Sequence, residues 1–107
     1  MVRKRGRPKR QKLIHQKPKT LIFSPRGRPG RPDEVTIYLD EFEALRLADY
    51  ENLTQNQAAN YMCTSRATFG RIIRQAHAKV AEALICGKII KIIPLQRTIN
   101  GFSRTLR

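Results

Sequence analysis

The segment TQNQAANYMCTSRATFGRIIRQAHAKVAEALICG, residues 54–87, decides the fold that we expect of this chain. Thr54 and Gln57 have the spacing of a capping box, in which each side chain satisfies a free backbone N–H of the other residue at a helix start. Ser65 is a second residue of the N-cap type, and Gly87 is a residue that commonly ends helices. The segment therefore predicts a short helix, a tight turn and a long helix.

The apolar residues of the two predicted helices indicate how they pack. In the first helix, residues 55–62, Ala59 is small enough to let the second helix approach, and Ala58 and Met62 also face inward. The second helix, residues 66–86, has an apolar stripe with a period of about 3.6 residues. Its members are Phe69, Ile72, Ile73, Ala76, Val80, Ala83 and Leu84. This pattern predicts a helix-turn-helix, with a core of Ala59, Met62, Phe69 and Ile72.

The same stripe fixes which residues of the second helix face outward. They are small or basic and lie around its first half: Ser65, Arg66, Ala67, Gly70, Arg71 and Arg74. This half of such a helix is the part that enters a major groove of DNA. Arginines there bind guanine edges or phosphates, a Ser hydroxyl at the helix start binds a phosphate, and Ala contacts a thymine methyl group, while Gly permits close approach. A solvated basic face on an ordinary three-helix core is the alternative.

Upstream of this segment the sequence predicts two strands and a helix. Residues 19–23 and 35–39 are β-branched and aromatic runs bounded by Pro and Gly, and the loop between them could close a hairpin. A helix is expected over 39–50, capped by Asp40 with Glu43 three residues later. We expect its buried stripe to be Phe42, Leu45 and Ala48, and its solvated face to carry Glu41, Glu43 and Glu51.

Downstream, the run KIIKII at 88–93 has strong strand character. It could pair with the strand at 35–39 within one chain, or with a second subunit. The latter would make a homodimer that presents two recognition helices to a two-fold site. Residues 94–107 are expected to be a mobile basic tail, so the predicted helix-turn-helix domain covers 19–93.

The charge of the chain is large and unevenly distributed. Its 107 residues include 22 Lys and Arg against 8 Asp and Glu, a net charge of +14. Twelve of the basic residues and no acidic residue fall in 1–32. We expect residues 1–18 to be a flexible arm whose partner is a polyanion. A solubilising tail and a membrane-binding patch are the alternatives, but the arm lacks amphipathic periodicity and is broken by prolines.

The tetrapeptide RGRP occurs twice in this basic segment, as Arg5-Gly6-Arg7-Pro8 and Arg26-Gly27-Arg28-Pro29. The pattern resembles the AT-hook. Gly between two Arg lets an extended backbone lie on the floor of a narrow minor groove, where the guanidinium groups follow A·T edges. For the first copy, a general phosphate clamp is the alternative. The second copy adjoins a predicted strand and could instead be a structural turn.

Other classes of protein find little support in the sequence. It has no run of about 18 apolar residues to span a bilayer, and no secretory signal opens it, so we expect a cytoplasmic, nucleoid-associated protein. Cys63 and Cys86 stand alone, and His15 and His77 lack ligand spacing, so neither a metal nor a cofactor is expected. No acid, base and nucleophile are grouped as a catalytic set, so we expect no enzyme.

The stretch LDEFEALRLADYENLTQNQAANYMCTSRATFGRIIRQAHAKVAEALICGK, residues 39–88, resembles a small prokaryotic family of predicted DNA-binding proteins, domain of unknown function 134 or uncharacterised protein family 0251. The resemblance covers roughly 7–91, and its most specific strings are LDEFEALRLAD at 39–49 and SRATFGRI at 65–72. The helix-turn-helix of this family is similar to that of sigma-factor region four. The resemblance implies sequence-directed DNA binding, with transcriptional regulation as the expected role.

Three features of this chain bear on that resemblance. Cys63 stands where the family has Gly in the turn, and a left-handed residue with a Cβ costs about 1 kcal/mol. Gln11 and His15 stand where many relatives have a Cys pair, so no metal site is carried over. The segment 23–29 follows the family pattern Phe-x-Pro-x-Gly-x-Pro, which favours a structural role for Gly27 and Pro29.

The sequence therefore predicts a mainly α fold with a small β element, in which a helix-turn-helix core of the winged-helix or sigma region four type follows a flexible basic arm. We expect a regulator that binds double-stranded DNA, with the helix at 66–86 in the major groove and the RGRP arm in an adjacent A·T-rich minor groove. The alternatives are a protein that binds structured RNA and an accessory protein of RNA polymerase. Aromatic stacking platforms are absent, which counts against RNA.

Overall fold

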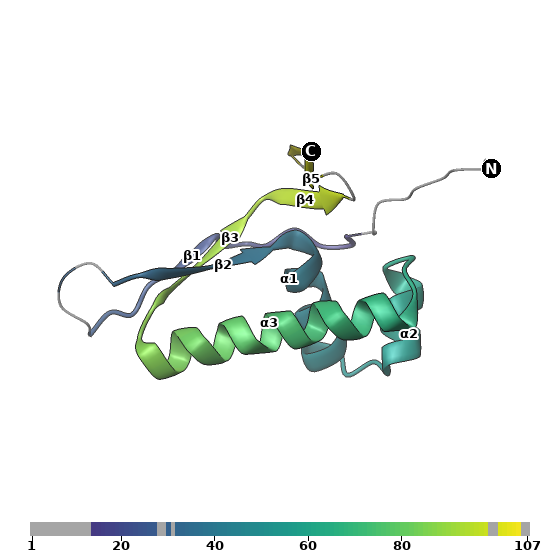
Figure 1. Cartoon of the computed structure of the whole chain (residues 1–107), viewed down its shortest axis with the longest axis horizontal. Helices are drawn as coiled ribbons and strands as arrows, with labels where there is room; N and C mark the ends of the chain where they lie inside the picture. Colours follow the sequence, from purple (N-terminus) through teal and green to yellow (C-terminus); the bar gives the residue numbers. More distant parts are fainter. Residues whose placement is uncertain (1–13, 28–29, 31, 99–100, 106–107) are drawn as a thin grey trace.

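The computed structural model describes residues 14–27, 30, 32–98 and 101–105, and Figure 1 shows their arrangement. Residues 1–13, which include the first RGRP, lie outside the described residues, as do Arg28 and Pro29 of the second copy. Along the chain, the elements are β1 (Ile22–Phe23), β2 (Glu34–Tyr38), α1 (Leu39–Leu45), the π-helical turn η1 (Arg46–Tyr50), α2 (Gln55–Tyr61), α3 (Arg66–Cys86), β3 (Ile89–Ile93), β4 (Leu95–Thr98) and β5 (Gly101–Thr105). The fold is mainly α with a small β element.

The three-stranded sheet has the order β1-β3-β2, so β3 lies between the two strands that precede the helices. β3 pairs in parallel with β2, with Val35 opposite Ile90 and Ile37 opposite Ile92, and antiparallel with β1. The predicted pairing of 88–93 with 35–39 within one chain is confirmed. The predicted hairpin between the first two strands is wrong, because the apolar residues of β3 occupy the position between them.

One core lies between this sheet and the helices, with α3 running beneath the sheet (Figure 1). Ile37, Leu39 and Ile92 are buried there. Residues that pack partly buried against them come from the N-terminal segment, α1, α3 and β3: Ile14, Phe42, Val80 and Ile90. The sheet thus holds the middle of α3 and leaves its opposite side open.

A second core holds the three helices together. It consists of Ala44, Leu47, Ala58, Ala59, Met62, Phe69, Ile72 and Ile73. The predicted core of Ala59, Met62, Phe69 and Ile72 is confirmed, with Met62 and Phe69 fully buried. Burying one such large side chain contributes about 1.5–3 kcal/mol. Leu84, predicted in the same stripe, is 75% exposed, because it lies beyond the residues of both cores.

The helix after β2 exists, but its cap and buried face differ from the prediction. The backbone N–H of Tyr38 donates to Glu41 Oε1 at 2.9 Å, so the cap stands two residues before the expected Asp40 and Glu43. The predicted stripe of Phe42, Leu45 and Ala48 is only half-buried, whereas Leu39, Ala44 and Leu47 are fully buried. The reason is that this helix packs on both cores and winds into the π-helical turn η1.

The predicted solvated acidic face is wrong for Glu41 and Glu43. Both are fully buried, and Asp40 is 1% exposed. Glu41 Oε1 accepts a hydrogen bond from Lys79 Nζ at 2.8 Å, and Glu43 binds Arg46, whose guanidinium pKa is raised above its ordinary value by the hydrogen bond to Glu43. Buried carboxylates require such partners. Of the three predicted acids, Glu51 is the one that is exposed.

The segment expected as a mobile tail contains two strands. β4 and β5 pair antiparallel, with Leu95 opposite Thr105 and Thr98 opposite Gly101. β4 also contacts α1 and β2, so this small sheet adjoins the larger one (Figure 1).

None of the helices in the described ranges has the length and apolar composition of a membrane span.

Candidate nucleic-acid interface

The start of α2 has the capping box that the sequence predicts. The Thr54 N–H donates to Gln57 Oε1 at 2.9 Å, and the Gln57 N–H donates to Thr54 Oγ1 at 3.1 Å. These two bonds satisfy backbone donors that the helix itself leaves free. The start of α2 is therefore fixed by hydrogen bonds within its own first turn.

The turn between α2 and α3 is closed by backbone hydrogen bonds around Cys63. The Cys63 N–H donates to Asn60 O at 3.1 Å, and the Thr64 N–H donates to Ala59 O at 3.0 Å. This pair of bonds defines a Schellman motif, whose left-handed position usually carries Gly. Cys63 occupies it with φ 55°, as the resemblance to the family implied.

Ser65 caps α3 and begins a short row of hydrogen bonds along the helix surface. Its Oγ accepts from the Thr68 N–H at 3.0 Å, and its hydroxyl lies 2.9 Å from Thr68 Oγ1. Arg71 Nη2 lies 3.5 Å from the same Thr68 oxygen. The Ser65 hydroxyl is thus used within the helix start, and Thr68, which sequence reasoning missed, connects it to Arg71.

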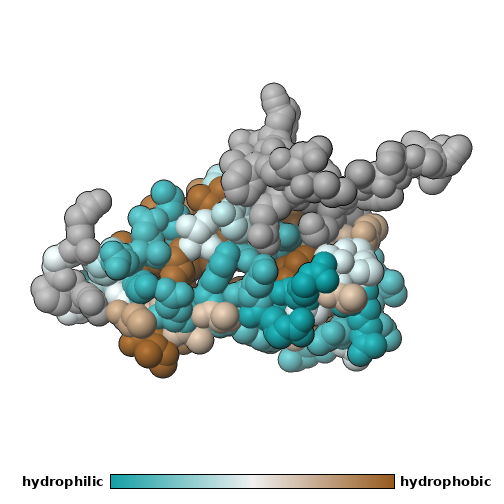
Figure 2. Space-filling view, viewed as in Figure 1, coloured by the Kyte–Doolittle hydropathy of each residue, from teal (hydrophilic) through white to brown (hydrophobic). Residues whose placement is uncertain are grey.

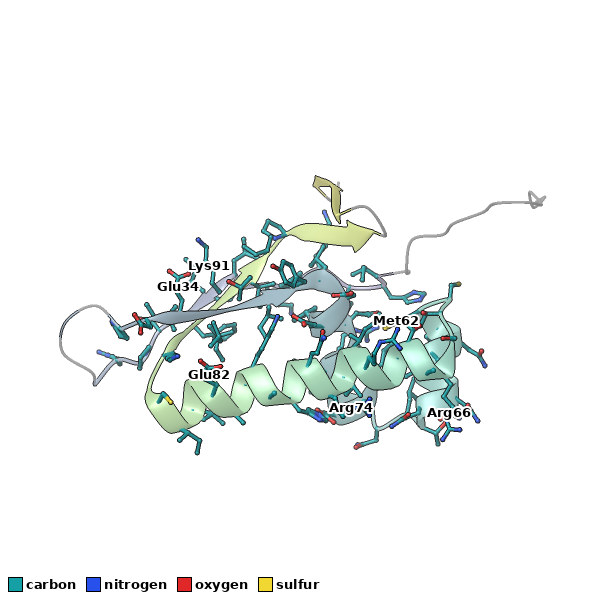
Figure 3. The ribbon with its side chains drawn as sticks, in the orientation of Figure 1. Glu34, Met62, Arg66, Arg74, Glu82 and Lys91 are labelled. Carbon is teal, nitrogen blue, oxygen red and sulfur yellow. The ribbon has the colours of Figure 1, made fainter. Side chains whose placement is uncertain are left out.

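Five of the six predicted outward residues line one shallow depression of about 670 Å³, and Ser65 does not. Its lining residues come from α3 except for the first: Gln55, Arg66, Ala67, Gly70, Arg71 and Arg74. Figure 3 shows Arg66 and Arg74 on the side of α3 that faces away from the sheet. Three guanidinium groups and no carboxylate line this surface, so its potential is positive. We call these six residues the arginine surface.

Gly70, which the sequence predicts to face outward, lines the arginine surface but is itself buried, since side chains cover it. A Cβ built on it would stand 3.6 Å from Gln55 Oε1 and 4.0 Å from Arg74 Nη1. Both neighbours are tips of long polar side chains rather than backbone. Gln55, the first residue of α2, is the second residue that sequence reasoning missed, because nothing in its local pattern indicates a place beside α3.

Arg26 and Gly27, the described half of the second RGRP, are exposed in the loop between β1 and β2. Figure 1 shows this end of the sheet away from α2, and Asp33, which precedes β2, accepts a hydrogen bond from Ile89 N at 2.8 Å just after α3 ends. From Gly70 to Gly87, α3 rises about 25 Å. The φ of Gly27 is outside the left-handed region, and nothing lies within 4 Å of an added Cβ, whereas Gly30 has φ 80°. The local backbone therefore needs Gly at 30 and not at 27.

The cysteines and histidines do not form a cluster. Cys63 and Cys86 are exposed and are not joined in a disulfide. His15 Nε2 lies 2.8 Å from Tyr61 O, and His77 Nε2 lies 2.7 Å from Asp49 Oδ2. No group of three or more His, Cys, Asp or Glu that could hold a metal occurs in the part of the chain that the structure describes.

Comparison with known proteins places the chain in a family. The family described as "Protein of unknown function DUF134" matches residues 1–95. A UPF0251 protein of Prosthecochloris aestuarii is 51% identical over 88 residues, which cover 81% of this chain and 57% of that protein. UPF0251 proteins of Methanococcus maripaludis strain C7 and Chlorobaculum tepidum are 43% and 47% identical, over 83% and 81% of this chain and 69% and 58% of their own lengths.

The aligned part thus spans little more than half the length of the first of these relatives. No solved structure matches the chain. The match over 1–95 and the shared identity are sufficient to assign the family. The chain belongs to the DUF134 family, and the relatives named above carry the name UPF0251.

Proposed function

We propose that this protein binds double-stranded DNA in a sequence-directed way and regulates transcription, with α2, the turn at Cys63 and α3 acting as a helix-turn-helix. The observation that carries the proposal is the arginine surface. Arg66, Arg71 and Arg74 are exposed on the first half of α3, which is the part of a recognition helix that enters the major groove. Arginines there bind guanine O6 and N7 with two hydrogen bonds.

The rigidity of the support favours reading of bases over loose electrostatic contact. Ser65 caps α3, Thr54 caps α2, and both helices pack on Met62 and Phe69, which are fully buried. Side chains on such a scaffold approach the DNA in one register, which discrimination between base pairs requires. The burial of Glu41 and Glu43 also keeps their charges away from the helix surface that would meet DNA.

We further propose that the basic arm supplies minor-groove contacts, with Arg5, Gly6, Arg7 and Pro8 as the first hook. For the second copy, the open space around Gly27 weakens the explanation that Gly is required by the turn. A Gly that the local fold does not need supports a contact role for Arg26, Gly27 and Arg28. Binding of this kind would place the protein on the nucleoid.

A second candidate function, an accessory protein of RNA polymerase, is favoured by the other end of α3. Leu84 and Ile85 are 75% and 83% exposed, and Figure 2 shows a hydrophobic area at the lower left, where α3 ends. Ile85 follows Arg74 by three helical turns, so both lie on the same side of the helix. A large exposed apolar pair is typical of a protein contact. If this second function holds, α3 would bind DNA with its first half and a protein with its last turns.

Arg71→Ala tests the proposed function. We would select duplexes from a random library with the wild-type protein, then measure fluorescence anisotropy on the selected site and on a scrambled one. The wild type should prefer the selected site, and Arg71→Ala should lose about 5- to 150-fold of that preference, the worth of one bidentate contact. Lys91→Ala is the matched control, since Lys91 is exposed on the far side of the sheet (Figure 3). If both variants lose the preference for the selected site to the same extent, α3 is not the helix that recognises the bases. If the protein binds folded RNA or polymerase more tightly than duplex DNA, the alternatives are favoured.

A further inference from the structure

We infer that Gln55 is a base-reading residue, so that α2 contributes to the arginine surface a side chain that selects adenine next to the guanine selected by arginine. The inference rests on the proposed DNA binding and goes beyond it, because it assigns part of the specificity to a helix other than α3. It also names the chemistry of the preferred site, an A·T pair beside a G·C pair.

The position of Gln55 is the first observation. It is the first residue of α2, it is exposed, and it lines the depression formed by Arg66, Arg71 and Arg74. Its amide therefore lies among the arginines rather than at the outer rim of the molecule. A side chain at the rim would meet phosphates, whereas one in this depression would meet what the arginines meet.

The second observation is that the Gln55 amide and the Arg74 guanidinium border the same point beside Gly70. Gln55 Oε1 and Arg74 Nη1 both lie within 4.0 Å of the point where a Cβ of residue 70 would stand. Stacked base pairs are separated by about 3.4 Å. The two side chains border one point on α3, so they can reach neighbouring base pairs, and no Cβ of residue 70 stands between them.

The third observation is that the fold does not use the Gln55 amide. The cap of α2 employs Thr54 and the side chain of Gln57, two residues further on. Within the described ranges, no hydrogen bond involves the side-chain amide of Gln55. Of the two glutamines in the first turn of α2, Gln57 caps the helix and Gln55 is available to a ligand.

The chemistry of the amide determines the base. A Gln side chain offers one acceptor and one donor edge, which match the N6 donor and N7 acceptor of adenine in the major groove. Arginine offers donors alone and matches guanine O6 and N7. A surface that presents both side chains around one point fits a step in which adenine adjoins guanine.

The test is a selection of duplexes from a random library by the full-length wild type, Gln55→Ala and Gln55→Glu. The wild type should select a motif with adenine at one position beside guanine. Gln55→Ala should lose the adenine preference there by about 5- to 150-fold and keep the guanine preference. Gln55→Glu should move the preference toward cytosine, whose N4 donates to a carboxylate. Gln75→Ala is the matched control, since Gln75 is exposed on α3 but does not line the depression.

The outcomes separate this inference from the proposed function. A wild type that selects no motif overturns sequence-directed binding and this inference with it. A wild-type motif that remains unchanged in both Gln55 variants overturns the inference alone. A uniform loss of affinity for all duplexes in Gln55→Ala assigns the side chain to a phosphate and overturns it as well. Equal melting temperatures of the variants establish that each result concerns binding rather than folding.

Discussion

The guanidinium of Arg46 binds the carboxylate of Glu43 through two hydrogen bonds, 2.9 Å from Nε to Oε1 and 2.8 Å from Nη2 to Oε2. Glu43 is fully buried, and the His15 N–H donates to its Oε2 at 3.0 Å. A two-bond pair of this geometry is among the stronger ionic contacts in proteins. The bond from the His15 backbone connects α1 to the N-terminal segment, so the Glu43 carboxylate has partners on both sides and can be buried.

Glu43→Gln should destabilise the fold by about 3 kcal/mol, because the largely buried Arg46 loses its charged partner. Thermal or urea unfolding measures the loss. Glu51→Gln is the control: Glu51 faces the same guanidinium at 3.3 Å, but its side chain is 45% exposed. Its removal should cost less than about 1 kcal/mol. If Glu51→Gln destabilises the fold as much as Glu43→Gln, burial of the Glu43 carboxylate is not the reason for the loss of stability.

Cys63→Gly should stabilise the protein. A residue with a Cβ in the left-handed region costs about 1–2 kcal/mol, and part of the gain from Gly is offset by the greater freedom it gives the unfolded chain. We expect a net gain of about 0.5–1 kcal/mol, measured as a higher melting temperature. Asn52 has φ 62° and belongs to a residue type that tolerates this region, so Asn52→Gly should gain less. A lower melting temperature for Cys63→Gly would show that the thiol makes contacts that outweigh the strain.

The features that the sequence predicts well are those decided by residues three to five positions apart. The caps at Thr54 and Ser65, the turn at Cys63 and the end of α3 at Gly87 all depend on hydrogen bonds of this range. The apolar stripe likewise predicts which arginines of α3 face outward. In each case the chemistry that fixes the structure is contained in the segment itself.

The features that the sequence does not predict depend on distant partners. Glu41 is buried because Lys79 reaches it from 38 residues away, and Glu43 receives a hydrogen bond from His15, 28 residues away. An acidic residue in a helix looks solvated until such partners are known. Gln55 belongs to the arginine surface for the same reason, since its place beside Gly70 follows from the packing of α2 on α3.

Deletion of residues 1–12 should weaken the dependence of DNA affinity on salt. The segment carries seven basic residues. The slope of log K against log salt is negative, and each lost phosphate contact makes it shallower by about 0.9. Titrations between low and moderate salt measure this slope. An unchanged slope would remove the arm from the interface.

The double variant Arg5→Lys and Arg7→Lys distinguishes a minor-groove hook from a general phosphate clamp in the arm. The charge is kept, so the salt slope should stay near the wild-type value, while the preference for A·T-rich flanks should fall, because Arg is the residue that narrow minor grooves favour. Competition between duplexes with A·T-rich and G·C-rich flanks measures that preference. If the Lys variant keeps the full preference, the arm is a phosphate clamp and not a hook.

Gly70→Ala should move stability and DNA affinity in opposite directions. A Cβ at 3.6 Å from Gln55 Oε1 is in ordinary contact, so the fold accepts it, and Ala in place of Gly inside a helix gains up to about 1 kcal/mol. In a domain of this size such a gain raises the melting temperature by about 4–8 °C. The methyl group would, however, stand between Gln55 and Arg74 on the surface that we propose meets the bases, and it should weaken binding to the selected duplex. Ala78→Gly, at an exposed position further along α3, should lower stability and leave binding unchanged. A Gly70→Ala protein that is more stable and binds as tightly as the wild type would mean that DNA does not approach α3 at Gly70.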